Sequence, residues 1–295
     1  MASKHPLNEV FGFRPDDMSD QARYHRDNRL CPFNNHVPQC TKDKVKNPLG
    51  VCSIDDNGVL AITCPVRFRQ DWTITRDTAI ELFPPETKWT ALHEVDLRDR
   101  FGKAAGTADF ILVSYDGNGR VLDFGALEVQ AVYVSGNIRE PFQSYMEHPE
   151  TRCNMDWSSA EHYPRADYLS SSRKRLLPQL IYKGRILRAW GKKTVVAIHR
   201  AFHATLPAMP ECEPDDAEVV WLVYDLERNP DKNSTGLVMV GEVFTRLEES
   251  IARIMSPEIG DVNGFVDILQ RRLDAVLSGH PPTRKRAPRQ QKTLL

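Results

Sequence analysis

LDFGALEVQAVYVSG, residues 122–136, decides the fold, because it has the two-residue alternation of a buried β-strand. Leu127 and Val129 point to one face of an extended chain, so Glu128 and Gln130 share the other face. A carboxylate and an amide on one face of an apolar strand can be solvated, can be hydrogen-bonded inside the protein, or can hold a metal ion. The stretch by itself leaves these three interpretations open.

A second strand is predicted at 107–116, TADFILVSYD, and the turn DGNG joins the two strands into a hairpin. Asp109 lies on that strand, and hairpin pairing brings it within reach of Glu128. Two carboxylates at one strand end are oxygen ligands suited to Mg²⁺. A water bound to such an ion, with its pKa lowered, can attack a phosphodiester. An acid followed two residues later by Gln is common, so the pattern alone is a weak indication of nuclease chemistry.

The totals describe an ordinary globular chain of 295 residues, 41% hydrophobic and 27% charged, with a net charge of −1. This length predicts one large α/β domain with an accessory module. No apolar run approaches the ~20 residues that span a bilayer. The start, MASKHPLNEV, has no apolar signal core, so we expect a cytoplasmic protein whose six cysteines are metal ligands before they are disulfides.

Positive charge is concentrated in one segment. Between Arg165 and His203 there are ten Lys or Arg residues against one acid, Asp167. They are Arg165, Arg173, Lys174, Arg175, Lys183, Arg185, Arg188, Lys192, Lys193 and Arg200. Such a local field attracts polyphosphate and favours DNA binding over the alternative of a solvated helix face. The basic tail, 281–295, is expected to be disordered, and it either lies on phosphates or adds solubility.

The first 70 residues are polar, rich in Pro and Asn, and contain Cys31, Cys40, Cys52 and Cys64. A segment with so few core residues usually needs a cross-link or a bound metal ion to be stable. A tetrahedral site of four thiolates provides one. The spacing lacks the paired CxxC units of a zinc ribbon, and four buried free thiols are the alternative. The remaining two cysteines, Cys153 and Cys212, are expected to be free.

The other expected elements alternate between helix and strand. Helices are predicted at 72–83, 89–97, 173–191, 241–255 and 264–277, and further strands at 193–199 and 218–227. The last helix carries apolar residues at helical spacing that we expect to face the core, namely Phe265, Ile268, Leu269, Leu273, Val276 and Leu277. The predicted class is therefore mixed α+β (α/β), with hairpin strands and flanking helices after a cysteine module.

Several short motifs occur in a fixed order along the chain. They are LCPFNN at 30–35, GVC at 50–52, TCPVR at 63–67, GALEVQ at 125–130 and LPQLIYKGRI at 177–186. Together they resemble the NotI-like Type II restriction endonucleases, the NotI/EagI group of the PD-(D/E)xK superfamily. The resemblance implies a four-cysteine metal-binding module over 1–70, a PD-(D/E)xK nuclease core with DNA-recognition elements over 71–280, and a tail over 281–295.

The resemblance also implies an activity. Members of the group are prokaryotic homodimers that cut GC-rich palindromic duplex DNA with Mg²⁺ and leave 5′ overhangs, and a site with a GGCC centre is expected here. Carried over to this sequence, Asp109 and Glu128 would bind Mg²⁺, and Gln130 would replace the usual superfamily lysine. The cysteines at 31, 40, 52 and 64 would hold a structural iron, or zinc.

Gln130 changes the chemistry, because an amide only donates and accepts hydrogen bonds. Nucleophile activation would then rest on the metal, helped by a cation from elsewhere. Lys183 is the candidate, four residues after Gln179 on one helix face, although a phosphate-contacting or solvated lysine is an equal alternative. Glu94, on the helix predicted at 89–97, is either an additional ligand or a surface acid.

At a G·C-rich site we expect Arg or Lys to contact guanine, and Asp or Glu to contact cytosine. The candidate DNA contacts are Arg139, Glu140, Arg173, Lys174, Arg175 and Lys183. Most cations in such interfaces contact phosphates instead. Two other functions fit the composition, a structure-specific or repair nuclease and a non-catalytic DNA-binding protein, but the second leaves the two carboxylates and Gln130 unexplained.

Overall fold

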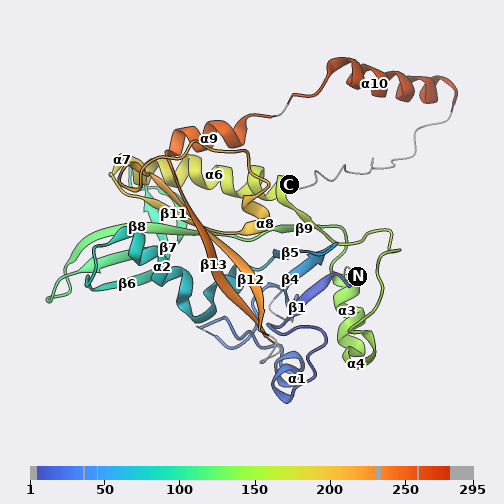
Figure 1. The fold of residues 1–295 in the computed structure, drawn as a ribbon, viewed down its shortest axis with the longest axis horizontal. Helices are drawn as coiled ribbons and strands as arrows, with labels where there is room; N and C mark the ends of the chain where they lie inside the picture. Colours follow the sequence, from blue (N-terminus) through green and yellow to red (C-terminus); the bar gives the residue numbers. More distant parts are fainter. Residues whose placement is uncertain (1–4, 36, 45, 230–233, 258, 280–295) are drawn as a thin grey trace. The chain divides into compact units, whose positions relative to one another are not determined.

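The computed structural model describes residues 5–35, 37–44, 46–229, 234–257 and 259–279 (Figure 1). The chain divides into two compact units, Met1–Met255 and Ser256–Leu295. The first unit contains every β-strand of the described chain, and the second contains one helix. The mixed α/β class predicted from the sequence is confirmed.

A six-stranded sheet organises the first unit, in the order β13-β12-β11-β8-β7-β6. Its strands are β6 (Trp89–Arg98), β7 (Ala104–Tyr115), β8 (Val121–Gln130), β11 (Thr194–His199), β12 (Val219–Asn229) and β13 (Ser234–Thr245). β11 runs parallel to both β8 and β12, and the other neighbours are antiparallel. The central strands are therefore buried on both faces, as parallel pairing requires.

The predicted hairpin is confirmed by the pairing of β7 with β8, in which Phe110 lies opposite Leu127. The Asp116 carboxylate accepts hydrogen bonds from the backbone N–H groups of Asn118 and Arg120, each at 2.9 Å, and so stabilises the turn. Gly119 adopts φ +80°, which a residue without a Cβ reaches at no steric cost.

Two predicted helices contain strands instead. Residues 89–97 form β6, whose side chains alternate between exposed and half-buried along the edge of the sheet. Residues 241–245 continue β13, and only α9 (Leu247–Met255) is helical. In both segments pairing with a neighbouring strand overrides the local helical pattern. The helix predicted at 72–83 is confirmed as α2 (Thr73–Leu82).

The basic segment forms a nearly continuous helical run on one face of the sheet. It consists of α5 (Tyr168–Ser171), η2 (Ser172–Leu176), α6 (Leu177–Gln179), η3 (Leu180–Gly184) and α7 (Arg185–Ala189). Both η2 and η3 are π-helical turns. Such turns are rare and are found frequently at functional sites.

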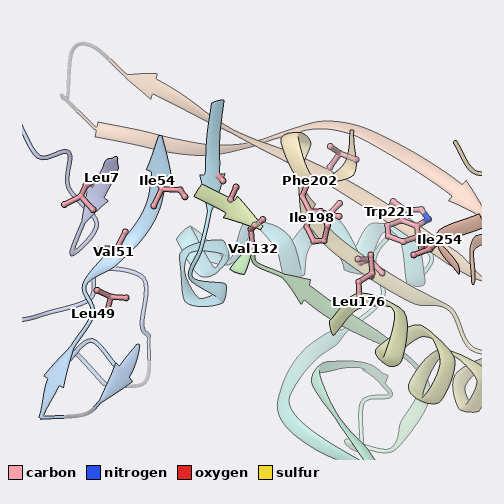
Figure 2. Packing of buried hydrophobic residues seen from close by; sticks show 14 of the residues in the cluster. Leu7, Leu49, Val51, Ile54, Val132, Leu176, Ile198, Phe202, Trp221 and Ile254 are labelled. Carbon is pink, nitrogen blue, oxygen red and sulfur yellow. The ribbon is translucent and has the colours of Figure 1, made fainter. Parts of the chain in front are cut away.

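Two hydrophobic clusters lie on the two faces of the sheet. Val196 and Ile198 of β11 belong to the cluster under the helical run, which includes Leu176 and Trp221 (Figure 2). The other cluster packs Leu127 and Val129 with residues of α2. The alternation predicted for 122–136 is thus confirmed, because Leu127 and Val129 face α2 while Glu128 and Gln130 are buried toward the helical run.

The N-terminal segment shares the first of these clusters through Leu7, Val51 and Ile54. It forms the three-stranded sheet β1-β4-β5, built from β1 (Leu7–Val10), β4 (Val51–Asp56) and β5 (Val59–Ile62). Its other elements are α1 (Asp20–Asp27), β2 (Asp43–Lys44), β3 (Asn47–Pro48) and η1 (Pro65–Trp72). The segment therefore packs against the large sheet rather than apart from it.

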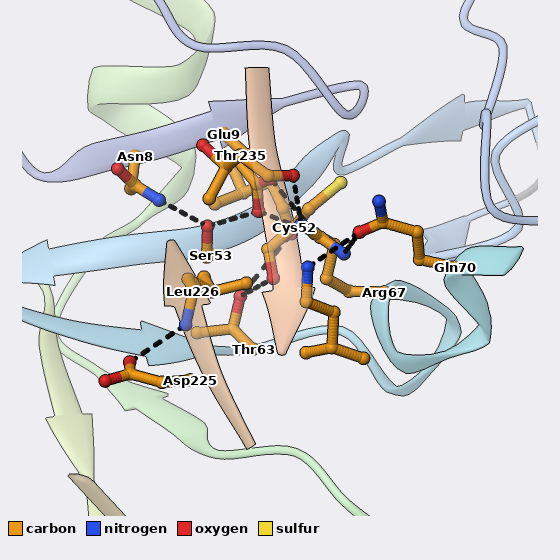
Figure 3. A network of polar contacts seen from close by, with 12 residues as sticks. Asn8, Glu9, Cys52, Ser53, Thr63, Arg67, Gln70, Asp225, Leu226 and Thr235 are labelled. Carbon is orange, nitrogen blue, oxygen red and sulfur yellow. Dashed lines mark hydrogen bonds and ion pairs between the residues drawn. The ribbon is translucent and has the colours of Figure 1, made fainter. Parts of the chain in front are cut away.

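Arg67 forms a buried ion pair within this segment and also joins the segment to β13 (Figure 3). Arg67 donates from Nε to Glu9 at 2.9 Å, and neither side chain is exposed to solvent. Arg67 also donates to the backbone oxygen of Thr235 at 2.9 Å and to Gln70 at 2.8 Å. Because its hydrogen-bonding groups are satisfied, the buried guanidinium costs less than an unpaired charge would.

The remaining elements are β9 (Tyr133–Ser135), α3 (Arg139–Glu147), α4 (Pro149–Arg152), β10 (Arg165–Asp167), α8 (Arg200–His203) and η4 (Pro214–Asp216). In the second unit, α10 (Val262–Leu277) confirms the predicted last helix, and the Asp261 side chain caps it by accepting from Gly264 N–H at 2.9 Å. Among the described residues there is no helix with the length and apolar character needed to cross a membrane.

Within the second unit the apolar face of α10 is uncovered, and the expectation that it packs into the core stays a prediction. Phe265 is 59% exposed and Leu277 is 75% exposed, and no described residue of this helix is buried. The spacing predicts which apolar side chains share one face of the helix, but it does not show what that face packs against.

Candidate active site

Asp109 and Glu128 meet at the end of the β7/β8 ladder. Phe110 pairs with Leu127, so one step further along the antiparallel strands Asp109 lies opposite Glu128. The Asp109 carboxylate accepts a hydrogen bond from the backbone N–H of Val129 at 2.8 Å, which fixes its orientation. The structure therefore brings the two predicted carboxylates together.

Glu128 is buried, with 2% of its surface exposed. Its Oε2 accepts from the Lys183 ammonium, whereas Oε1 has no hydrogen-bond partner within the described chain. Burial, and next the negative charge of Asp109, raise the pKa of Glu128 to about 7, against the opposing effect of Lys183. A buried carboxylate oxygen without a donor, beside a second carboxylate, is a place that favours a cation.

This donor set fits Mg²⁺, which binds through one or two carboxylates and completes its shell with waters and phosphate oxygens. No group of three His, Cys, Asp or Glu side chains arranged to hold a metal ion occurs in the described parts of the chain. Asp109 and Glu128 would therefore be the two central carboxylates, and waters, DNA oxygens and at most one further acid would complete the shell.

Gln130 is fully buried against the helical run. Its Nε2 donates a hydrogen bond to Oε1 of Gln179, and its own Oε1 has no partner in the described structure. The Gln130 amide, two residues after Glu128, is thus held by a second amide. Gln179 lies one helical turn before Lys183, whose ammonium contacts Glu128.

Three residues of the helical run, four apart in sequence, face β8 and β9. The Arg175 guanidinium stands 5.8 Å from the centre of the Tyr133 ring, Gln179 bonds Gln130, and Lys183 bonds Glu128. Residues four apart share one helix face, and the helix therefore presents a row of polar groups to this strand.

Lys183 comes closest to the two carboxylates. It is 6% exposed, and besides Glu128 it donates to the backbone oxygen of Thr107 at 3.0 Å. Gly106 leaves room for it: a Cβ at this glycine would stand 3.2 Å from Cγ of Lys183, and its φ of +130° also disfavours side chains. The backbone of β7 at Gly106 therefore leaves space for the Lys183 side chain.

Glu94 lies on a strand, not on the predicted helix, but it lies next to Asp109. His93 pairs with Phe110 and Val95 pairs with Ala108, which sets Glu94 opposite Asp109. Glu94 is exposed and adopts φ +50° inside β6. A left-handed residue within a strand is strained, and such strain collects at functional sites. Three acids thus stand in a row across β6, β7 and β8.

Most cations of the basic segment 165–203 are paired with acidic side chains. Six of its ten cations form ion pairs, namely Arg165, Lys183, Arg185, Arg188, Lys192 and Arg200. Arg173, Lys174 and Arg175 form none with other described residues, and the first two are exposed. The tenth, Lys193, forms no ion pair with another described residue either and donates to the backbone oxygen of Pro214 at 2.9 Å, so most of the unpaired charge lies at the start of the helical run.

The other two candidate DNA contacts begin α3. Arg139 is half-buried and forms an ion pair with Asp43 of β2. Glu140 is exposed and accepts a hydrogen bond from Asn137 at 3.2 Å. These residues lie on a different element from the helical run.

The four N-terminal cysteines are close to one another, and none forms a disulfide. Burial is the main cause that raises the pKa of Cys31 to about 12, and the neighbouring Cys64 and Cys40 add to it. Burial and then Cys64 also raise the pKa of Cys52. Cys40, Cys52 and Cys64 are buried and Cys31 is half-buried. In the described parts of the chain, no three His, Cys, Asp or Glu side chains form a group that could hold a metal ion. Cys153 and Cys212 lie elsewhere.

Comparison with known proteins identifies a family for the chain. A family model described as restriction endonuclease NotI matches residues 16–237, a span that includes the four cysteines, the two carboxylates and Lys183. A search of curated proteins gives no match to the chain. Since the matched span is more than half of the 295 residues, the chain belongs to the NotI restriction endonuclease family.

Proposed function

We propose that this Type II restriction endonuclease cleaves double-stranded DNA with a Mg²⁺ ion held by Asp109 and Glu128. The observation that carries the proposal is the buried Glu128, whose Oε1 has no hydrogen-bond partner in the described chain and whose pKa is raised by burial and by the nearby negative charge of Asp109. When bound, the ion supplies Lewis acidity and a water of lowered pKa.

The chain's own groups prepare the site for this chemistry. The Val129 N–H orients Asp109, and Lys183 holds Oε2 of Glu128 while Oε1 has no partner in the described chain. Burial around Glu128 excludes bulk water and strengthens each charge interaction there. Glu94, the next acid in the row, is proposed as the additional carboxylate.

The proposed substrate is a GC-rich palindrome with a GGCC centre, cut to leave 5′ overhangs. Membership of the family supports this, and Arg173, Lys174 and Arg175 supply cations that no described acid neutralises. Arg139 and Glu140 remain the proposed base readers. The tail over 281–295 lies outside the described residues, and the division of the chain at residues 70 and 280 stays a prediction.

The catalytic assignment is tested by Asp109→Asn and Glu128→Gln. Each variant should lose at least ~100-fold in plasmid cleavage in Mg²⁺, because one ligand of the ion is gone. The measurement is a time course of plasmid digestion, run beside wild-type protein with EDTA. Asp123→Asn is a matched control on the same strand, since Asp123 pairs with Lys192 away from the site.

Two outcomes would contradict the proposal. If both carboxylate variants cut at the wild-type rate, the ion is held elsewhere. If wild-type protein gives a smear or cuts only branched DNA, the protein is a structure-specific nuclease rather than a sequence-specific one. Binding that is equal in EDTA and Mg²⁺, without nicking, would indicate a DNA-binding protein instead.

We also propose that Cys31, Cys40, Cys52 and Cys64 hold one structural iron, or zinc. Purified protein with iron should be reddish, with visible charge-transfer absorption, and Cys52→Ser should lose the metal and the colour. Metal analysis per chain checks this, with Cys212→Ser as the control, because Cys212 lies outside the group. A protein without any bound metal, with all four thiols reactive, would refute the site.

A further inference from the structure

Lys183 is the only buried ammonium in contact with the proposed metal-binding pair among the described residues. It enters from the π-helical turn η3 and reaches Glu128 of β8 and the Thr107 oxygen of β7. Both strands that carry the carboxylates therefore hold this one amino group. An ammonium has three donors, and two are used, so one N–H remains.

A purely structural ion pair would not account for this arrangement. The local charge is not balanced, because one ammonium stands beside two carboxylates, Asp109 and Glu128. Buried ion pairs also add little stability, since desolvation offsets most of the attraction. The ion pair leaves Oε1 of Glu128 without a hydrogen-bond partner in the described chain. A contact that mainly stabilised the fold would satisfy both oxygens.

The surrounding residues guide the lysine to this position. Gly106 keeps β7 open where the Lys183 stem passes, as any Cβ there would crowd it. One turn earlier, Gln179 bonds Gln130 and fixes the helix against β8. The strand position where the superfamily has its lysine is occupied by a buried amide, while a lysine arrives beside it from the helix.

We infer that Lys183 is the positive group of the active site, supplied by the helix in place of a strand lysine, and that its remaining N–H binds an oxygen of the scissile phosphate. This rests on the proposed function of Asp109 and Glu128. Lys183 would then stabilise charge that develops on the phosphate during hydrolysis. Gln130 is a positioning residue, which acts through Gln179 on the helix that carries the lysine.

The experiment uses the full-length protein and compares Lys183→Gln and Lys183→Met with wild type. Single-turnover cleavage in Mg²⁺ should fall by roughly 100-fold or more, because one preorganised donor to the reacting group is lost. The affinity for duplex DNA in Ca²⁺ should change by less than about tenfold, since a single phosphate contact is removed. Lys192→Gln, a lysine paired with Asp123, is the control and should cut normally.

A relocated lysine separates a role in the chemistry from a role in packing. The double variant Gln130→Lys with Lys183→Gln should regain at least tenfold of the lost rate, whereas a packing defect at Lys183 would not be repaired by a lysine on β8. Lys183→Met keeps the volume of the side chain without a buried charge, and thermal unfolding checks that it is folded.

The inference is overturned if folded Lys183→Met cuts at the wild-type rate, or if the relocated lysine restores nothing. It is also overturned if DNA affinity in Ca²⁺ falls as steeply as the cleavage rate, because Lys183 would then be a binding contact only. Wild-type cleavage by the Asp109 and Glu128 variants would instead refute the proposed function, and the two failures are therefore distinguishable.

Discussion

At the scale of residues, Glu128 links folding stability to pH when no metal is bound. Its pKa is raised from 4.5 to about 7, so the folded protein binds a proton that the unfolded chain releases. The stabilising contribution is complete below pH 4.5 and is lost as the pH rises through about 7. In EDTA, the free energy of unfolding should fall by up to about 1.4 kcal/mol per pH unit across this window.

Urea denaturation at several pH values measures this slope. Glu128→Gln removes the titrating group while keeping the shape of the side chain, and should flatten the curve between pH 4.5 and 7. An unchanged slope in the variant would mean that another group causes the pH dependence.

The sequence predicted some of these residue positions but not all. Asp109 and Glu128 are joined by a short hairpin, and local pairing was enough to predict that they meet. Lys183 was only a candidate, because its contact with Thr107 spans 76 residues and depends on how the helix docks. Nothing local marked Gly106 as the residue that makes room for it.

At the scale of elements, the strain in β6 gives a prediction at Glu94. A residue at φ +50° costs roughly 1 kcal/mol unless it is glycine. Glu94→Gly should therefore have a free energy of unfolding about 1 kcal/mol higher than Glu94→Ala. At Asp96, an exposed position of the same strand without positive φ, the order should reverse.

Chemical denaturation of the four variants makes this comparison, and the lost side-chain contacts cancel within each pair. If glycine is the weaker residue at both positions, the left-handed backbone at Glu94 is not strained.

Element type is predicted best away from the edges of the large sheet. The sequence predicts the hairpin, α2, β11 and β12, but it predicts helix for β6 and for the end of β13. Both are edge strands of the large sheet, and an edge strand is paired on one side only. Their side chains are half-exposed, so the residue pattern carries a weaker strand signal than in the buried β11.

At the scale of the whole molecule, we propose a homodimer, because one pair of carboxylates per chain cuts one strand and a duplex has two. The apolar side chains Leu269 and Leu273 of α10, which are uncovered within the second unit, are the proposed contact with the second copy. Placing a charge there should prevent association, because burying an unpaired carboxylate is costly. Leu269→Asp with Leu273→Asp should be monomeric and should nick rather than cut.

Light scattering after size exclusion gives the mass of each form, and plasmid digestion gives the ratio of nicked to linear product. Gln270→Ala, which lies on the same helix and contacts Asp274, should remain dimeric. A wild-type protein with the mass of one chain would refute the dimer, and a dimeric double variant would move the interface away from α10.

The contact between Arg67 and Thr235 has a consequence for the order in which the protein folds. It joins residues 168 apart, so the loop that it closes includes most of the chain. Because the ribosome makes the N-terminal part first, Glu9, Arg67 and all four cysteines exist well before β13 does. Contacts of such long range form slowly. The N-terminal segment must therefore wait for the last strand before its buried arginine is satisfied, and its docking is a late event in folding.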